Sequence, residues 1–256
     1  MKKIIISFLI IVLSGCSYFQ DKGDETELWP AERLYAEARG ELDSGSYERA
    51  VELYEKLEAR FPFGTFGQQA ILDLAYAYFK NDEPDAAVST AERFIKLYPQ
   101  NAHVDYAYYL KGLANMQRGK GITERFLPLD ESQRDSASAL WAFEDFSDLV
   151  YRYPDSQYAA DAKLRMKHLR NVLAEHEVHV ARYYMRRGAY IAAANRARYV
   201  IEKYARTPSI PDALVIMAKA YKILELDELS EDALRVLELN YPNTPGIYDV
   251  RAITLQ

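Results

Sequence analysis

The chain has 256 residues, a formal net charge of −6 and a hydrophobic fraction of 49%. This length allows one large domain or two smaller ones. The composition combines 11 glycines and 21 tyrosines with many Ala, Leu, Glu and Arg residues. It therefore favours helix and weighs against a protein built of sheet.

The first residues have the pattern of a secretory signal. Lys2 and Lys3 precede an apolar run from Ile4 to Leu13, and small residues lead to Cys16. About 20 apolar residues are needed to span a bilayer, so this run is too short for a permanent span. We expect residues 1–15 to be a cleaved signal peptide.

Cys16 is the only cysteine, and it directly follows Leu-Ser-Gly. The segment resembles a bacterial lipoprotein signal, in which this cysteine is acylated and becomes the first mature residue. The alternative is an ordinary signal beside a stray thiol, which would be a liability in an oxidising compartment. The following residue is Ser17 rather than Asp, which in lipoproteins implies the outer membrane. We expect residues 16–28 to form the lipidated cysteine and a flexible tether.

An internal repeat dominates the remaining chain. Four aromatic-proline pairs close helical stretches. Counting back from each proline, the residue at 12 positions is small, the one at 8 is mostly bulky, and the one at 5 is apolar. A fifth copy has Ala205 in the place of proline. The sets are Ala50, Tyr54, Leu57; Ala87, Ala91, Phe94; Ala142, Phe146, Leu149; Ala193, Ala197, Val200; and Ser230, Leu234, Leu237.

These offsets match the second helix of a tetratricopeptide repeat. The first helices repeat too, and Gly112 takes the small-residue place in the third repeat. We predict an all-α, right-handed α-solenoid of five tetratricopeptide-like helix pairs. An inserted loop is expected around 118–134, and one long helix over 157–187 with Ser156 as its N-cap and Gly188 near its end. Repeats one to three are assigned to 29–155, and repeats four and five to 156–256.

Several strings resemble one family more closely than a general repeat protein. They are Phe61-Pro62-Phe63-Gly64 with Gln68-Gln69, Tyr153-Pro154-Asp155-Ser156-Gln157-Tyr158, and Tyr183-Tyr184 with Arg187-Gly188-Ala189. They resemble the tetratricopeptide-repeat lipoproteins of the outer-membrane β-barrel assembly machine. The resemblance implies a scaffold that binds the central, BamA-like barrel subunit through its C-terminal repeats, beside other lipoproteins of the complex. Its N-terminal repeats would bind targeting signals of unfolded outer-membrane proteins.

Three arginines are candidates for contact with the barrel subunit: Arg187, Arg196 and Arg198. Arg196 matches the position of the family's contact to that subunit. Residues 161–206 contain eleven Lys or Arg and four Asp or Glu, although such a stretch is usually a solvated face. Arg196 and Arg198 stand beside small alanines, which leave a guanidinium room to reach a carboxylate. Export excludes a nucleic acid as the partner.

Aromatic residues of the N-terminal repeats are candidates for a peptide groove. Most are expected to pack between helices, but some must face the concave side. A barrel protein's last strand has apolar side chains that need such pockets. The candidates are Phe61, Phe63, Tyr76, Tyr106 and Tyr109.

The sequence has no constellation for catalysis. His176 and His179 lie at helical spacing without a third ligand, so we expect the polar face of a helix and no metal. Nucleotide and hydrolase motifs are missing, and no cofactor is expected. The function left open besides barrel assembly is that of a pilotin-type lipoprotein for a secretion or pilus system. An enzyme acting on the cell wall would need catalytic residues that we do not find.

Overall fold

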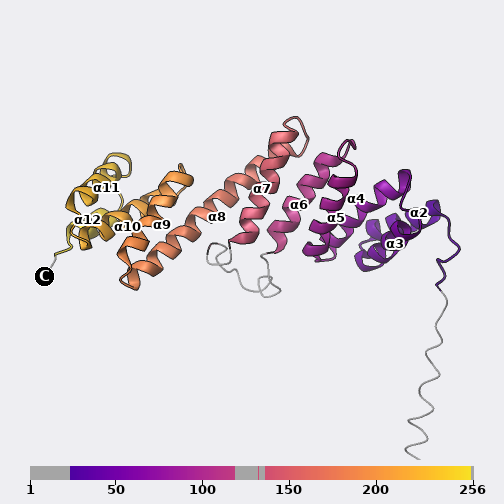
Figure 1. Ribbon diagram of the computed structural model, residues 1–256, viewed down its shortest axis with the longest axis horizontal. Helices are drawn as coiled ribbons and strands as arrows, with labels where there is room; N and C mark the ends of the chain where they lie inside the picture. Colours follow the sequence, from indigo (N-terminus) through magenta and orange to yellow (C-terminus); the bar gives the residue numbers. More distant parts are fainter. Residues whose placement is uncertain (1–23, 119–131, 133–135, 255–256) are drawn as a thin grey trace, which may run out of the picture.

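The computed structural model describes residues 24–118, 132 and 136–254. Their regular structure is α-helical, with helices that follow one another closely along the chain (Figure 1). The helices are α2 (Ala31–Ser44), α3 (Tyr47–Arg60), α4 (Thr65–Lys80), α5 (Pro84–Leu97), α6 (Val104–Arg118), α7 (Ala137–Arg152), α8 (Ala159–Arg186), α9 (Tyr190–Lys203), α10 (Ile210–Ile223), α11 (Asp227–Asn240) and α12 (Gly246–Arg251).

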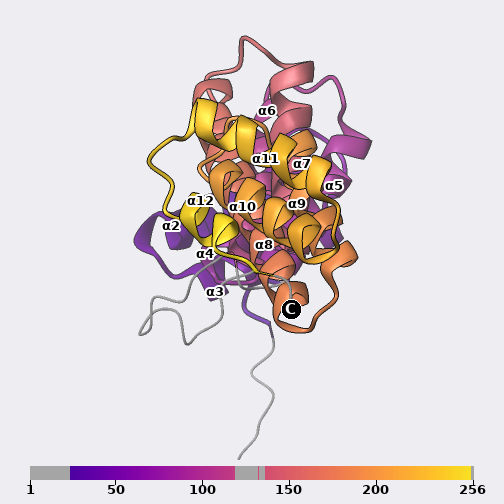
Figure 2. The same ribbon diagram turned by 90° about the vertical axis from the view of Figure 1, so that its left-hand side faces the viewer.

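Consecutive helices pack against each other from α2 to α11, which gives five helix pairs in a linear array. The pair α2/α3 lies at one end and α10/α11 at the other, where α12 packs mainly on α10 (Figure 1). Figure 2 looks along this array from the C-terminal end and shows the pairs stacked behind one another. The predicted all-α fold of tetratricopeptide-like pairs is confirmed.

The second helix of every pair ends as the repeat pattern predicts. The residue that follows each helix is aromatic, and its backbone N–H donates to the carbonyl four residues earlier: Phe61, Tyr98, Tyr153, Tyr204 and Tyr241. The positions predicted to be small are buried with at most 1% exposure. They are Ala50, Ala87, Ala142, Ala193 and Ser230. Small side chains at these points let neighbouring helices approach closely, so the period has a packing cause.

The long helix α8 joins the two halves of the array. Its N-terminal half contributes Ala162 and Leu169 to a core shared with α6 and α7, and its C-terminal half contributes Val178 and Ala181 to a core shared with α9, α10 and α11. Figure 1 shows α8 running obliquely between these parts. One continuous helix therefore connects the N-terminal and C-terminal repeats.

The start of α8 differs from the prediction. The helix begins at Ala159, two residues later than expected, and Ser156 does not cap it. The Ser156 hydroxyl instead donates to Asp105 Oδ2 at 2.6 Å, and it accepts from the backbone N–H of Tyr158. Asp105 of α6 therefore holds the turn that precedes α8. The predicted C-terminal end is confirmed, because Gly188 follows the helix with a φ of +72°.

Part of the predicted flexible tether is instead ordered. The Asp24 carboxylate accepts from the backbone N–H and the hydroxyl of Thr26, and it pairs with Lys56 of α3 at 2.9 Å. Arg60 donates from its two terminal nitrogens to the carbonyl oxygens of Thr26 and Trp29, each at 2.7 Å. Sequence patterning missed this because the contacts to Lys56 and Arg60 join residues more than thirty positions apart.

Three predicted features lie wholly or largely outside the described residues. They are the acylated Cys16, the tether as far as residue 23, and the inserted loop, of which only Arg118 and Ser132 are described. Among the described helices, none combines the length and apolar character that crossing a membrane requires.

Candidate functional site

The first helices α4 and α6 lie side by side and bring three tyrosines close to a fourth, which lies just before α8. Tyr76 on α4 and Tyr106 on α6 pack against the same small core. The ring of Tyr158, just before α8, lies 5.3 Å from that of Tyr106 and stacks on that of Tyr109 at 4.9 Å. We call Tyr76, Tyr106, Tyr109 and Tyr158 the tyrosine row. The row is partly exposed, so its rings can contact a ligand.

A buried carboxylate lies on α4, three positions before Tyr76 of the row. Asp73 of α4, 7% exposed, accepts from the hydroxyl of Tyr35 at 2.9 Å and from Nε2 of Gln69 at 3.0 Å. Burial raises the pKa of Asp73, although these hydrogen bonds and Arg39 oppose the change. Burial and the carboxylate of Asp73 raise the pKa of Tyr35 to about 12. Both tyrosine and carboxylate are therefore held in fixed positions between α2 and α4.

A second carboxylate holds the row at its Tyr109 end. The Tyr109 hydroxyl donates to Oδ2 of Asp161, and Arg165 donates to the same oxygen. The hydrogen bond from Tyr109, together with Arg165, lowers the pKa of Asp161. The guanidinium of Arg165 also lies 5.9 Å above the Tyr109 ring. The ionised Asp161 thus holds both the Tyr109 ring of the row and the Arg165 guanidinium beside it.

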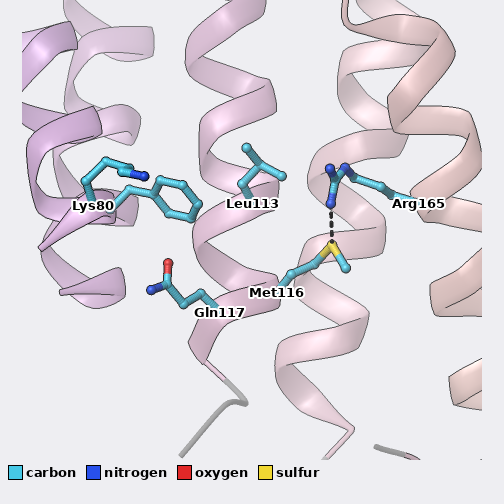
Figure 3. A pocket seen from close by; sticks show the side chains of 6 residues that line it. Lys80, Leu113, Met116, Gln117 and Arg165 are labelled. Atoms are coloured by element: carbon cyan, nitrogen blue, oxygen red, sulfur yellow. Dashed lines mark hydrogen bonds between the residues drawn. The ribbon is translucent and has the colours of Figure 1, made fainter. Parts of the chain in front are cut away.

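A pocket of about 330 Å³ lies beyond this end of the row (Figure 3). The amide nitrogen of Gln117 donates to Oδ1 of Asp82 at 2.5 Å, which orients the side chain. Its carbonyl oxygen is buried, has no hydrogen-bond partner among the described residues, and is directed into the space between α4 and α6 in Figure 3. The lining residues are Phe79, Lys80, Leu113, Met116, Gln117 and Arg165. The pocket therefore offers apolar walls and two cations, and the unpaired carbonyl oxygen of Gln117 is buried in its wall.

The five predicted groove aromatics divide into two groups. Tyr76, Tyr106 and Tyr109 lie in the tyrosine row. Phe61 instead follows α3, packs on the core of the first pair, and has the Arg60 guanidinium 5.1 Å above its ring. Phe63 is 89% exposed in the α3–α4 connection. The structure therefore brings three of the five together and leaves two in a loop.

The predicted docking arginines lie around the α8–α9 pair. Nη1 of Arg196 on α9 lies 3.0 and 3.3 Å from the two carboxylate oxygens of Glu177 on α8. Arg198 donates to the side-chain oxygen of Asn195 and to the Tyr221 hydroxyl on α10. Arg187 is exposed at the end of α8. The Arg196 side chain is 47% exposed and that of Glu177 only 14%, so the acid orients an outward-facing guanidinium.

Comparison with known proteins decides the family. A family model described as outer membrane lipoprotein (YfiO) matches residues 29–237. An outer membrane protein assembly factor BamD of Neisseria gonorrhoeae is 45% identical over 96% of this chain and 93% of its own length. The corresponding protein of Vibrio cholerae is 38% identical over 90% of this chain and 94% of its own. The chain belongs to the BamD family.

BamD-family membership places the chain among outer membrane lipoproteins that act as assembly factors and not as enzymes. Of the two functions that the sequence left open, it supports assembly of outer membrane proteins over a pilotin. The solved TPR domain of P58(IPK) also aligns, with a TM-score of 0.42 and 15% identity, over 86% of this chain and 63% of that one.

The two histidines differ from the exposed pair that we expected. His176 and His179 are both partly buried, and Nδ1 of His176 lies 2.8 Å from the carbonyl oxygen of Ser132. Among the described residues, no group of three potential ligands could hold a metal ion. In this BamD-family chain, His176 links α8 to the segment before α7.

Several residues of the site were missed by sequence analysis. Tyr158 completes the tyrosine row, Glu177 orients Arg196, and Gln117 places a buried carbonyl oxygen in the pocket wall. The string from Tyr153 to Tyr158 drew attention to Tyr158 only as a family feature. No local signal identifies Gln117 or Glu177, because their roles depend on other helices.

Proposed function

We propose that this lipoprotein is a scaffold of the outer-membrane β-barrel assembly complex. It holds an extended targeting segment of an unfolded outer-membrane protein along the tyrosine row. It binds the central barrel subunit through the outward face of α8 and α9. The observation that carries the proposal is the tyrosine row, which crosses three successive repeats and leads to an open pocket.

The chemistry of the row suits an extended chain. Partly exposed tyrosines supply amphipathic contact areas with few rotatable bonds, so binding costs little side-chain entropy. Lys80 and Arg165 favour a ligand with an acidic group beside an apolar side chain. These contacts support recognition of one extended segment.

Site-directed photocrosslinking tests the groove. A photoreactive side chain replaces Leu113, which lines the pocket, in the full acylated protein, and a urea-unfolded barrel protein is then added. We expect a crosslink that an excess of the barrel protein's last-strand peptide abolishes. Val236 on α11, 46% exposed, is the matched control position. Equal crosslinking at both positions, or no competition by the peptide, contradicts the groove.

Arg196 has the geometry of a docking residue. One of its terminal nitrogens binds Glu177, and the rest of the guanidinium remains available to a partner carboxylate. Because Glu177 already orients the planar guanidinium, Arg196 loses less entropy on binding a second carboxylate than a freely rotating arginine would. This supports a contact between Arg196 and an acidic side chain of the barrel subunit, with Arg187 and Arg198 near it.

The docking test uses Arg196→Lys, which keeps the charge and removes the fork. Charge reversal is a poorer test, because it places a carboxylate against the mostly buried Glu177. We expect capture of the barrel subunit from solubilised membranes to fall by about tenfold. Arg235→Lys is the matched control, since the exposed Arg235 also pairs with an acid but lies on α11. Equal capture by all three proteins contradicts the docking site.

A further inference from the structure

The two most exposed large apolar side chains of the described residues lie in two connections, one before α2 and one between α3 and α4. Leu28 is 93% exposed and Phe63 is 89% exposed. Isolated apolar residues on a protein surface are common. These two are notable because one contact joins their segments: α3, which precedes Phe63, binds the segment before α2, which contains Leu28.

Arg60 makes that contact. It binds the carbonyl oxygens of Thr26 and Trp29, and Leu28 lies between them in the chain. Phe63 follows Arg60 by three positions, in the connection to α4. The guanidinium therefore fixes the two apolar segments at one end of the solenoid. We call Leu28, Trp29 and Phe63 the N-terminal corner.

Trp29 adds an amphipathic residue to this corner. Its ring is partly exposed, and the guanidinium of Arg33 lies 4.1 Å above it. Tryptophan is enriched where proteins meet the headgroup region of a membrane, because it has an apolar body and one polar N–H group. Arginine beside it can contact lipid phosphate groups. The corner thus combines residue types that suit a membrane interface.

The anchor holds the corner close to a membrane. The chain belongs to a family of outer membrane lipoproteins, and Cys16 and Asp24 are eight positions apart. Eight residues reach at most about 28 Å when fully extended. Asp24 and Thr26 are already fixed to α3. Such a short connection gives weakly inserting side chains a high local concentration at the lipid surface.

The charges around the N-terminal corner indicate which kind of lipid surface it can contact. Glu25, Glu27 and Glu32 are exposed, whereas Arg33 and Arg60 supply the nearby positive charge. Attraction to anionic lipid requires an excess of basic residues, which is missing here. Contact must therefore depend on apolar insertion.

We propose that the N-terminal corner inserts into the headgroup region of a zwitterionic phospholipid surface. Leu28 and Phe63 enter the interface, and Trp29 lies at headgroup depth. The end of the solenoid is then held against the membrane by the folded protein as well as by its acyl chains. This inference is independent of the proposed peptide groove and docking site, and it assigns Phe63 a role outside the groove.

Quenching of tryptophan fluorescence by brominated lipid tests the proposal. The chain has two tryptophans, so Trp141→Phe leaves Trp29 as the reporter in the full acylated protein. We expect brominated zwitterionic vesicles to quench Trp29 strongly. Trp29→Phe leaves Trp141, on α7, as a second reporter that should remain unquenched.

The decisive variant is Leu28→Ser with Phe63→Ser, made beside the Trp29 reporter. Both side chains are almost fully exposed, so the fold should be retained, as circular dichroism checks. We expect quenching of Trp29 to fall about threefold or more. Tyr151→Ser with Leu239→Ser, which removes two exposed residues elsewhere, should leave it unchanged. Quenching that survives loss of Leu28 and Phe63, or that requires anionic lipid, overturns the proposal.

Discussion

Gly112 of α6 faces the ring of Phe146 on α7 so closely that a Cβ at residue 112 would lie 2.6 Å from Cε1. Both residues are buried. No real Cβ contact is that short, so the ring or a helix must move when any other residue occupies this position. The missing side chain of Gly112 is therefore the reason that α6 and α7 can pack at their observed distance.

Gly112→Ala should destabilise the protein by about 1–3 kcal/mol, because it overpacks the α6–α7 contact. Chemical denaturation monitored by circular dichroism measures the change. Gly40→Ala is the matched control, since Gly40 lies in helix α2 and a Cβ there would meet nothing within 4 Å. That control should stabilise the protein by about 0.5–1 kcal/mol through helix propensity. Similar effects of the two substitutions would contradict this account of the packing.

Asp73→Asn should change the pH dependence of stability. The folded-state pKa of Asp73 is raised above 3.8, so above that pH the folded chain retains this proton longer than the unfolded chain. The free energy of unfolding due to this group therefore falls as pH rises from about 4 towards the folded-state pKa. Asparagine has no such dependence.

Urea unfolding of both proteins between acid and neutral pH measures this effect. Relative to the wild type, the Asp73→Asn variant should gain stability as pH rises, and the gain should level off above the folded-state pKa. Parallel pH profiles for the two proteins would show that the carboxyl group is not perturbed.

Tyr109→Phe should lower the free energy of unfolding at neutral pH, and this loss should become smaller as the pH falls. The Tyr109 hydroxyl is the main cause of the lowered pKa of Asp161. A lowered carboxyl pKa stabilises the folded state above the ordinary value and loses this contribution as pH falls through the folded-state value. We expect a loss below about 1 kcal/mol at neutral pH, because Asp161 is partly exposed. The difference from wild type should shrink in acid, which urea unfolding at two pH values checks.

Arg60→Ala should release the segment before α2. Its two hydrogen bonds hold the carbonyl oxygens of Thr26 and Trp29 against α3. A protease specific for glutamate should then cleave after Glu25 or Glu27 several-fold faster, since cleavage follows local opening. Arg49→Ala on the same helix is the control, because Arg49 bonds locally, to Glu52 three positions away. Equal cleavage rates in the two variants would exclude this role of Arg60.

Local repetition explains how much of the fold could be predicted. Ala50, Ala142 and Gly112 are small where two helices meet, and aromatic residues follow the second helices, so a regular contact leaves a regular pattern. The helix start at Ala159 was misplaced because the Ser156 hydroxyl binds Asp105 on another helix. The candidate site was only partly predictable. Three tyrosines were found from their helices, whereas Phe61 and Phe63 lie in a connection between helices.

The sequence by itself determined the repeating helix pairs and the family, and it predicts the signal with its single cysteine. Each of these depends on residues close together in the chain or on a strict period. Only the tertiary structure decided that Tyr158 joins the tyrosine row, that the carbonyl oxygen of Gln117 is buried, and that Glu177 orients Arg196. The angles and separations of packed helices set these contacts, and they arise from the whole core rather than from any one segment.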